Sequence, residues 1–253
     1  MPTVTAVVIT RNEAAHVLAC LATLAFADEI VVVDDASTDA TAELARQAGA
    51  RVIVHAHEGE NWDLNKNVGM DAATGDWVLL IDADERVSAE LAADIRQAIQ
   101  DTPHAAFWLP RNEFYFGFHA RHAASGAKVL RLFRRGAARF EGERLHVNPR
   151  VEGSIGELTQ PLDHLAYATV REYVDKTNRY TDHEAATRYA AGNRAGWREI
   201  VLEPLKLFRY RYWVLKGYKD GMPGLVFSLV TSLYPLLQNL KLWELEARGR
   251  RSE

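Results

Sequence analysis

The chain has 253 residues, of which 48% are hydrophobic and 25% charged, as is ordinary for a globular protein with a sizeable core. Its single cysteine, Cys20, excludes a disulfide framework and a cysteine-based metal site and favours a reducing compartment. The net charge of −4 is the sum of an acidic body (residues 1–185, net −10) and a basic tail (residues 186–253, net +6), which predicts an anionic partner for the tail.

The first hundred residues alternate between strand and helix patterns. Strands are expected at Val4–Thr10, Glu29–Val33, Arg51–Val54 and Asp76–Ile81. Helices are expected from Asn12-Glu13 onward and at Ala40–Ala48, Trp62–Ala73 and Ala89–Gln100. Such alternation predicts an α/β fold with a doubly wound, mostly parallel sheet.

After Pro103 the pattern becomes strand-like and aromatic, with polar turns in place of long helices. The expected strands are Ala106–Leu109, Phe114–Phe118 and Lys128–Phe133, and a helix is expected from about Val170 past Tyr180. These strands are predicted to extend the sheet and to build a second wall of a cleft.

Three acidic residues, Asp82, Asp84 and Glu85, follow the buried strand that ends at Ile81. Carboxylates this close repel one another unless a cation lies among them. In an open α/β sheet, ligands bind beyond the carboxyl ends of the strands. A divalent metal that holds a phosphorylated ligand is therefore one interpretation, and a solvated acidic turn before the next helix is the other.

Polar loops follow two further strands of the predicted sheet, at Thr10–Glu13 and at Asp34–Ser37. Parallel strands would bring all three loops to one edge of the sheet. The chain has neither GxGxxG after its first strand nor a P-loop motif, so a metal carried by carboxylates is the remaining way to hold a diphosphate. Asp84 is the first choice of metal ligand, with Asp82 beside it for a sugar or ribose. Lys66 is either a phosphate contact at the same edge or a solvated helix lysine.

Several stretches together resemble family 2 glycosyltransferases of the GT-A fold, and in particular the branch of lipopolysaccharide-core β-glucosyltransferases. The resemblance covers nearly the whole chain. It is carried by Val7–Glu13, Val31–Asp39, Lys66-Asn67, Gly75–Glu85, Leu130–Arg135, His164, Lys176–Tyr180 and Lys241–Glu244.

The resemblance implies a role for individual residues. Residues 1–103 would form the nucleotide-sugar-binding half of one domain and 104–185 its acceptor half. The nucleotide-sugar, commonly a UDP-sugar, would contact Thr10, Arg11, Asn12, Glu13, Asp35, Lys66, Asp82 and Ala83. Mg²⁺ or Mn²⁺ would bridge the Asp82/Asp84 pair to the diphosphate. His164 would approach the metal or diphosphate, although a histidine there is otherwise simply hydrogen-bonded.

Transfer by such enzymes inverts the anomeric carbon, and a carboxylate deprotonates the acceptor hydroxyl. Many members of the branch carry a His-Glu pair after the Phe-Arg-Arg strand, but this chain has His146 followed by Val147. We therefore predict Glu143 as the base, with Glu141 next and His146 orienting a group beside it. The alternative is that Glu143 is a surface acid.

The tail, residues 186–253, is rich in aromatic residues and cations. Leu205–Lys219 has the composition of a helix that lies in the plane of an anionic membrane, whereas the uncharged stretch Leu225–Leu240 is short for a spanning helix. We expect residues 200–240 to contact the membrane surface; a helical hairpin packed on protein is the alternative.

The predicted activity is metal-assisted transfer of a sugar to an envelope or lipopolysaccharide-type glycan, or to a lipid-linked acceptor. No signal peptide follows Met1, so the predicted location is the inner face of the cytoplasmic membrane, with no nucleic-acid partner. Nucleotidyl transfer on a related fold and a catalytically inactive glycan-binding scaffold are the alternatives.

Overall fold

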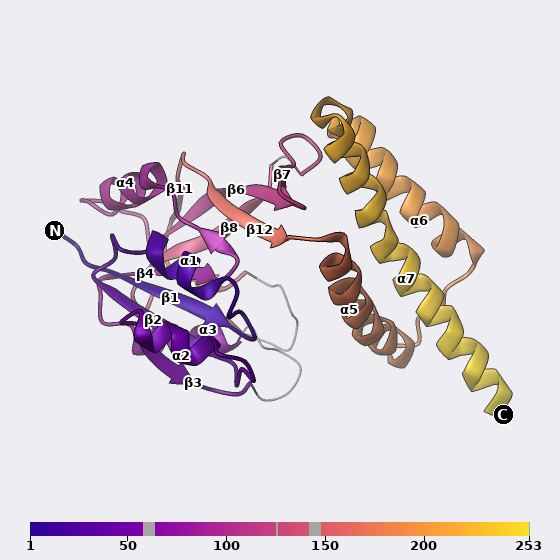
Figure 1. Ribbon diagram of the computed structural model, residues 1–253, viewed down its shortest axis with the longest axis horizontal. Coiled ribbons are helices and arrows are strands. Elements are labelled where there is room, and N and C mark those ends of the chain that lie inside the picture. Colours follow the sequence, from indigo (N-terminus) through magenta and orange to yellow (C-terminus); the bar gives the residue numbers. More distant parts are fainter. Residues whose placement is uncertain (58–63, 125, 142–147, 253) are drawn as a thin grey trace. The chain divides into compact units, whose positions relative to one another are not determined.

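The computed structural model of the chain describes residues 1–57, 64–124, 126–141 and 148–252 and has two compact units (Figure 1). Unit 1 comprises Met1–Arg111 and Gly126–His164, and unit 2 comprises Asn112–Ser125 and Leu165–Glu253. Unit 2 begins before the expected boundary at residue 186, because the helix Val170–Ala190 packs along the last helix of the chain.

Unit 1 is built on a mostly parallel sheet with the strand order β3-β2-β1-β4-β8-β6-β12-β5, which confirms the predicted fold class. β1 pairs in parallel with both β2 and β4, whereas β8 runs antiparallel to β4 and β6. The bounds are β1 Val4–Thr10, β2 Glu29–Asp34, β3 Arg51–Val54, β4 Trp77–Asp82, β5 Glu85–Arg86, β6 Ala106–Tyr115, β8 Lys128–Arg134 and β12 Leu162–Tyr167. Two short strands, β7 (Phe118–His119) and β11 (Ile155–Glu157), pair with β6. The strands β9 (Ala138–Arg139) and β10 (Arg150–Val151) form a separate two-stranded sheet.

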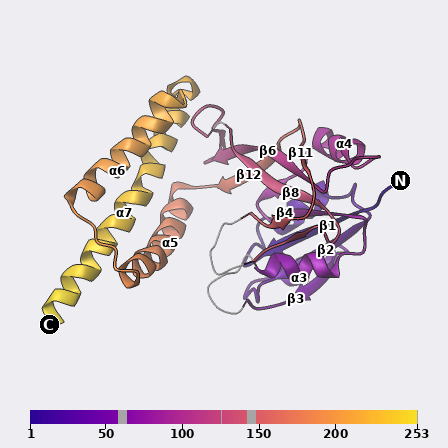
Figure 2. The same ribbon diagram turned by 180° about the vertical axis from the view of Figure 1, so that it is seen from behind.

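Helices cover both faces of this sheet. The helices α1 (Val17–Thr23), α2 (Thr41–Gln47) and α4 (Ala89–Ala98) contribute to the core on one face. α3 (Asn65–Ala72) covers the other face, seen from behind in Figure 2. α3 lies so close to the sheet that a Cβ atom on Gly69 would stand 2.2 Å from Cγ1 of Val7. Strands β1, β2 and β4 are therefore apolar on both sides, as their sequence predicts.

The structure differs from the expected start of the first helix and from the expected division of one strand into two. The first helix begins at Val17 and not at Asn12, because Asn12 has φ +56° and its side chain accepts a hydrogen bond from the Thr38 N–H. The expected strands 106–109 and 114–118 are largely one strand, β6, which continues through Pro110 and its polar neighbours. Pro110 has no backbone N–H, so the strand loses one possible ladder hydrogen bond at this position while Pro110 still pairs with Lys128 of β8.

Unit 2 is helical, and both α5 (Val170–Ala190) and α6 (Trp197–Arg209) pack against the long helix α7 (Met222–Ser252) (Figure 1). A π-helical turn, Tyr210–Val214, and a 3₁₀ turn, Gly217–Asp220, connect α6 to α7. The expected helix across Leu205–Lys219 is thus interrupted, at Lys216, whose φ is +60°. The helical tail itself is confirmed.

Candidate active site

Strand register brings the predicted loops to one edge of the sheet. Thr10 at the end of β1 pairs with Asp34 at the end of β2, and Ile9 pairs with Asp82 at the end of β4. The carboxyl ends of the three strands are therefore level with one another. The loops that follow them form one rim, as expected from the parallel order.

The first two loops of the rim are tied together by side chains. Asn12 Oδ1 accepts the Thr38 N–H at 2.8 Å, and the Asn12 N–H donates to Ser37 Oγ at 2.8 Å. Thr10 Oγ1 donates to Asp34 Oδ1 at 3.2 Å, and the Glu13 N–H donates to a threonine hydroxyl of α2. These predicted nucleoside contacts thus also shape the loops that would receive the ligand.

Asp35 lies buried in the loop that follows β2. The backbone N–H of His57 donates to its Oδ1 at 2.8 Å, the His57 ring contacts both oxygens, and Arg11 donates to Oδ2 at 3.0 Å. Burial alone would raise the pKa of Asp35, but the hydrogen bonds from His57 and Arg11 hold the pKa below its usual value. Asp35 is therefore an ionised acceptor with a fixed orientation.

At the end of β4, an arginine to which the sequence analysis assigned no role holds two carboxylates together. Arg131, on β8, donates from one guanidinium nitrogen to Asp82 Oδ2 and to Glu85 Oε1, the latter at 3.0 Å. Glu85 is fully buried, and its Oε2 also accepts the Asp82 N–H at 2.8 Å. Arg111 of β6 lies 3.8 Å from the same Glu85 carboxylate. The alternative interpretation of this segment as a solvated acidic turn is therefore wrong for Glu85, which belongs to a buried ion cluster.

The pKa values of Asp82 and Glu85 are shifted in opposite directions within this cluster. Burial alone would raise the pKa of Asp82, but the charges of Arg131 and Lys66 hold it well below its usual value. Burial raises the pKa of Glu85, and the negative charges of Asp82 and Asp84 add to this while Arg131 opposes it. Asp82 therefore remains charged at the rim, and Glu85 serves beneath it as a fixed acceptor.

Asp84 and His164 meet at the same end of the strand. His164 of β12 pairs with Glu85 of β5, and its Nε2 lies 3.5 Å from Asp84 Oδ2. Both side chains are less than one-fifth exposed. Ala83 between the acids is buried, and its carbonyl accepts a hydrogen bond from Arg86. The structure thus brings together the predicted pair of Asp84 and His164, from segments 80 residues apart.

The fit of this pair to a divalent cation follows from its donor atoms. A carboxylate oxygen and an imidazole nitrogen suit Mg²⁺ or Mn²⁺ when substrate phosphates and water supply the other ligands. Among residues 1–57, 64–124, 126–141 and 148–252, no group of three His, Cys, Asp or Glu side chains is arranged to hold a metal by itself. Asp84 and His164 thus fit a metal ion that binds together with a diphosphate.

The predicted base, Glu143, and its neighbour His146 lie outside the described residues. Glu141 is described: it is exposed, lies 4.0 Å from Arg150 and lines a hollow with Asp71 and Arg139. Lys66 stands over the ring of Phe140 at 5.1 Å, close enough to Asp82 to lower its pKa.

The sequence interpretation missed Arg131, Arg111 and His57. Arg131 offered a signal, because it is a charged residue between Leu130 and Leu132 in an otherwise buried strand, and such a residue needs a charged partner. His57 and Arg111 gave none, since their contacts with Asp35 and Glu85 depend on pairing between distant segments.

The class of protein follows from the fold, the rim and a family comparison. The sequence profile of the family "Glycosyl transferase family 2" matches residues 5–152, and the chain belongs to that family. It is therefore a glycosyltransferase with a GT-A-type α/β fold, and the family implies a nucleotide-sugar donor and a glycan acceptor.

Its relatives include enzymes of similar length. The lipopolysaccharide core biosynthesis glycosyltransferase LpsC of Rhizobium meliloti is 25% identical over 249 residues, covering 96% of this chain and 92% of LpsC. An uncharacterized glycosyltransferase of Rickettsia typhi is 27% identical over 265 residues, covering 99% and 90%.

Two solved structures are similar to the chain, one over nearly its whole length and one over less than half. S. aureus TarS 1-349 is 15% identical with a TM-score of 0.47 and covers 98% of this chain and 92% of its own. Glucosyl-3-phosphoglycerate synthase from Mycobacterium tuberculosis, in complex with Mn²⁺ and UDP, is 24% identical with a TM-score of 0.36 and covers 45% and 44%.

Proposed function

We propose that the protein transfers a hexose, with inversion, from a nucleotide-diphospho-sugar to a lipopolysaccharide-type envelope glycan. Membership of glycosyltransferase family 2 and similarity to LpsC support the reaction class and the type of acceptor. The observation that carries the proposal is the rim itself, where Asp35 follows β2 and Asp82, Asp84 and His164 lie together at the end of β4. UDP is the expected nucleotide.

Asp35 would select the base of the donor. Its ionised carboxylate accepts hydrogen bonds, so it would pair with an imide N–H of uracil. His57 and Arg11 keep its orientation fixed, which avoids an ordering cost on binding. Asp82, held by Arg131, would accept hydrogen bonds from ribose or sugar hydroxyls.

Asp84 and His164 would hold Mg²⁺ or Mn²⁺ together with the donor diphosphate. When bound, the ion neutralises charge that develops on the leaving diphosphate. Lys66, whose charge already acts on Asp82, would add a cationic contact to the phosphates. Arg131 and Glu85 would act as positioning residues, since they fix the strand end from which Asp82 and Asp84 project.

The acceptor hydroxyl would lose its proton to Glu143, with His146 orienting a group beside it and Glu141 as the second candidate base. Kinetics of Glu143→Gln and Glu141→Gln test this role, because glutamine keeps the shape of the side chain and removes its basicity. Loss of turnover in Glu143→Gln alone is the expected result. Near-native turnover in both variants would contradict the assignment.

The reaction class is tested by the product that a nucleotide-sugar releases in Mn²⁺. We expect nucleoside diphosphate, whereas a nucleotidyltransferase would release pyrophosphate and an inactive scaffold neither. Asp84→Ala should abolish release. Asp71→Ala is the matched control, because Asp71 is an exposed acid of α3 that pairs with the exposed Arg139. Equal release by Asp84→Ala and the wild type would refute the proposed site.

We propose further that the tail binds an anionic membrane surface at the inner face of the cytoplasmic membrane. From α6 to the 3₁₀ turn, large apolar side chains are exposed: Trp197, Val201, Leu202, Leu205, Tyr210, Trp213, Val214 and Tyr218. Exposed cations alternate with them at Arg198, Lys206, Arg209, Lys216 and Lys219. This mixture is typical of helices that lie in the interface of an anionic bilayer.

Within the described residues, one helix, Met222–Gly249, is also long and apolar enough to cross a membrane, although a helix buried in a soluble protein would meet the same criterion. Sedimentation with anionic and zwitterionic vesicles tests the surface interaction. Trp213→Ser should weaken binding to anionic vesicles more than Trp243→Ser, since the two indoles are similarly exposed but only Trp213 lies in the basic aromatic segment. A wild-type protein that fails to sediment with anionic vesicles would contradict the proposal.

A further inference from the structure

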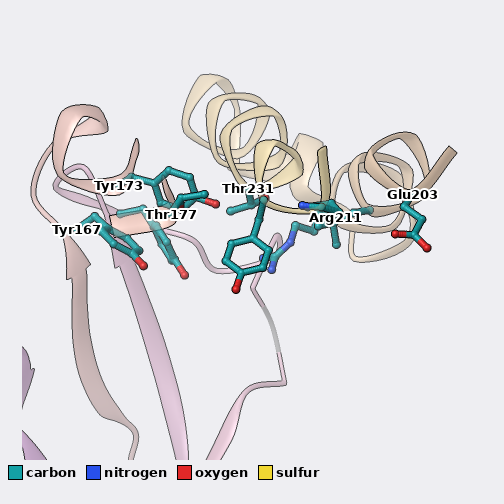
Figure 3. A pocket seen from close by; sticks show the side chains of 10 residues that line it. Tyr167, Tyr173, Thr177, Glu203, Arg211 and Thr231 are labelled. Atoms are coloured by element: carbon teal, nitrogen blue, oxygen red, sulfur yellow. The ribbon is translucent and has the colours of Figure 1, made fainter. Parts of the chain in front are cut away.

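Unit 2 contains a cavity of about 410 Å³ that no step of the proposed reaction uses (Figure 3). Four tyrosines line it: Tyr115, Tyr167, Tyr173 and Tyr234. In Figure 3 the labelled Tyr167 and Tyr173 lie at one end of the cavity and Glu203 at the other, with Arg211 and Thr231 between them. The volume is in the range of about 300–1,000 Å³ that is common for ligand pockets.

The tyrosine rings of the cavity wall contact one another. The rings of Tyr167 and Tyr173 meet edge to face with centroids 4.9 Å apart, and those of Tyr115 and Tyr167 are 5.7 Å apart. Lys176 lies 5.2 Å above the Tyr167 ring. Burial raises the pKa of Tyr173, whose hydroxyl is hydrogen-bonded to Thr177. Packed aromatic rings with polar edges suit the C–H faces and hydroxyls of a sugar ring.

Arg211 contributes a positive charge to the cavity and, among the described residues, is without an ion-pair partner of its own. Its guanidinium lies 4.7 Å from the centroid of the Phe227 ring. In the part of the chain that the structure describes, its buried Nε has no hydrogen-bond partner, and no carboxylate lies within 4.0 Å of the guanidinium to form an ion pair. The carboxylate of Glu203, by contrast, accepts a hydrogen bond from Asn239 Nδ2 at 2.8 Å. A partly buried guanidinium without a partner favours an anion.

We propose that this cavity binds an anionic sugar, that is, a sugar ring that bears a carboxylate or a phosphate. Arg211 would bind the anionic group, the tyrosine faces would stack on the ring, and Glu203 would accept a sugar hydroxyl. The positive charge of Arg211 favours an anionic group over a quaternary ammonium group. In taking this sugar to be part of the acceptor, the inference rests on the proposed function.

The test is equilibrium binding of small sugars to the full-length chain at constant ionic strength, followed by saturation-transfer NMR. The probes are glucuronate, glucose 6-phosphate, glucose and inorganic phosphate. We expect at least one anionic sugar to bind more tightly than both glucose and phosphate. Comparing glucuronate with glucose 6-phosphate shows whether the cavity prefers a carboxylate or a phosphate. Arg211→Gln should weaken that binding about 10- to 100-fold, as for a lost charged hydrogen bond. Arg209→Gln, the same change at an exposed neighbour, should weaken it less than twofold.

Three results would overturn the inference: glucose or phosphate binding as tightly as the anionic sugars, equal losses in the two variants, or no binding by any sugar. If Arg211→Gln fails to fold, Arg211→Lys keeps the charge and loses the planar fork, and it should weaken binding by a smaller factor. Release of nucleoside diphosphate is measured separately on the wild type. Sugar binding without release refutes the proposed function alone, and release without sugar binding refutes this inference alone.

Discussion

Replacing Arg131 by methionine should be among the most destabilising single changes in unit 1. The substitution keeps most of the volume of the side chain but leaves the buried Glu85 and the partly buried Asp82 without their cation. Removing one partner of a buried ion pair costs about 3–5 kcal/mol, because the remaining charge stays desolvated. With a urea dependence of roughly 3 kcal/mol per molar for a chain of this size, the unfolding midpoint should fall by about 1 M or more.

The matched control is Arg139→Met. Arg139 pairs with Asp71 at 2.9 Å, but both side chains are more than half exposed, so the loss should be about 0–1 kcal/mol. Urea unfolding of both variants at pH 7, followed by circular dichroism, compares them directly. Adding Asp82→Asn and Glu85→Gln to Arg131→Met should restore much of the stability, because no charge is then stranded. Similar midpoints for Arg131→Met and Arg139→Met would refute the reasoning.

Three further predictions concern other parts of unit 1. The folded state depresses the pKa of Asp35, so the stability that this group contributes is present above its unfolded pKa of about 3.9 and is lost as the pH falls through the folded pKa. The stability difference between wild type and Asp35→Asn should therefore shrink from pH 7 to pH 3 in urea titrations, and a constant difference would contradict this. Gly69→Ala should cost about 1–3 kcal/mol in the same assay, because its Cβ would overlap Val7, and a neutral effect would mean that α3 shifts freely. Burial raises the pKa of the Cys20 thiol to about 12, so a thiol reagent should modify it only in urea, and fast labelling of the native protein would contradict the buried site.

The sheet was predictable because its central strands carry their own signal. Runs such as Val78–Ile81 are apolar on both faces, and only a strand covered on both sides needs that. The rim followed from the parallel order alone. Asn12 was misassigned to a helix because its conformation is set by hydrogen bonds to residues 37 and 38, which a local pattern does not contain.

The parts that the sequence did not predict depend on distant segments. The polar residues after Pro110 indicated a turn, yet they continue β6, and one of them, Arg111, faces the Glu85 carboxylate. Similarly, the two-residue strand β5 depends on its pairing with β12, and that pairing brings His164 to Asp84. The resemblance to a family implied the role of His164, but its position required the structure.

The central claim is that Asp84 and His164 hold a divalent ion together with the donor diphosphate. Calorimetric titration of UDP into the protein, with Mn²⁺ or with a chelator, tests it most directly. We predict binding that requires Mn²⁺, is lost in Asp84→Ala, is strongly weakened in His164→Ala and is retained in Asp71→Ala. Binding of UDP to Asp84→Ala with the affinity and Mn²⁺ dependence of the wild type would contradict the claim.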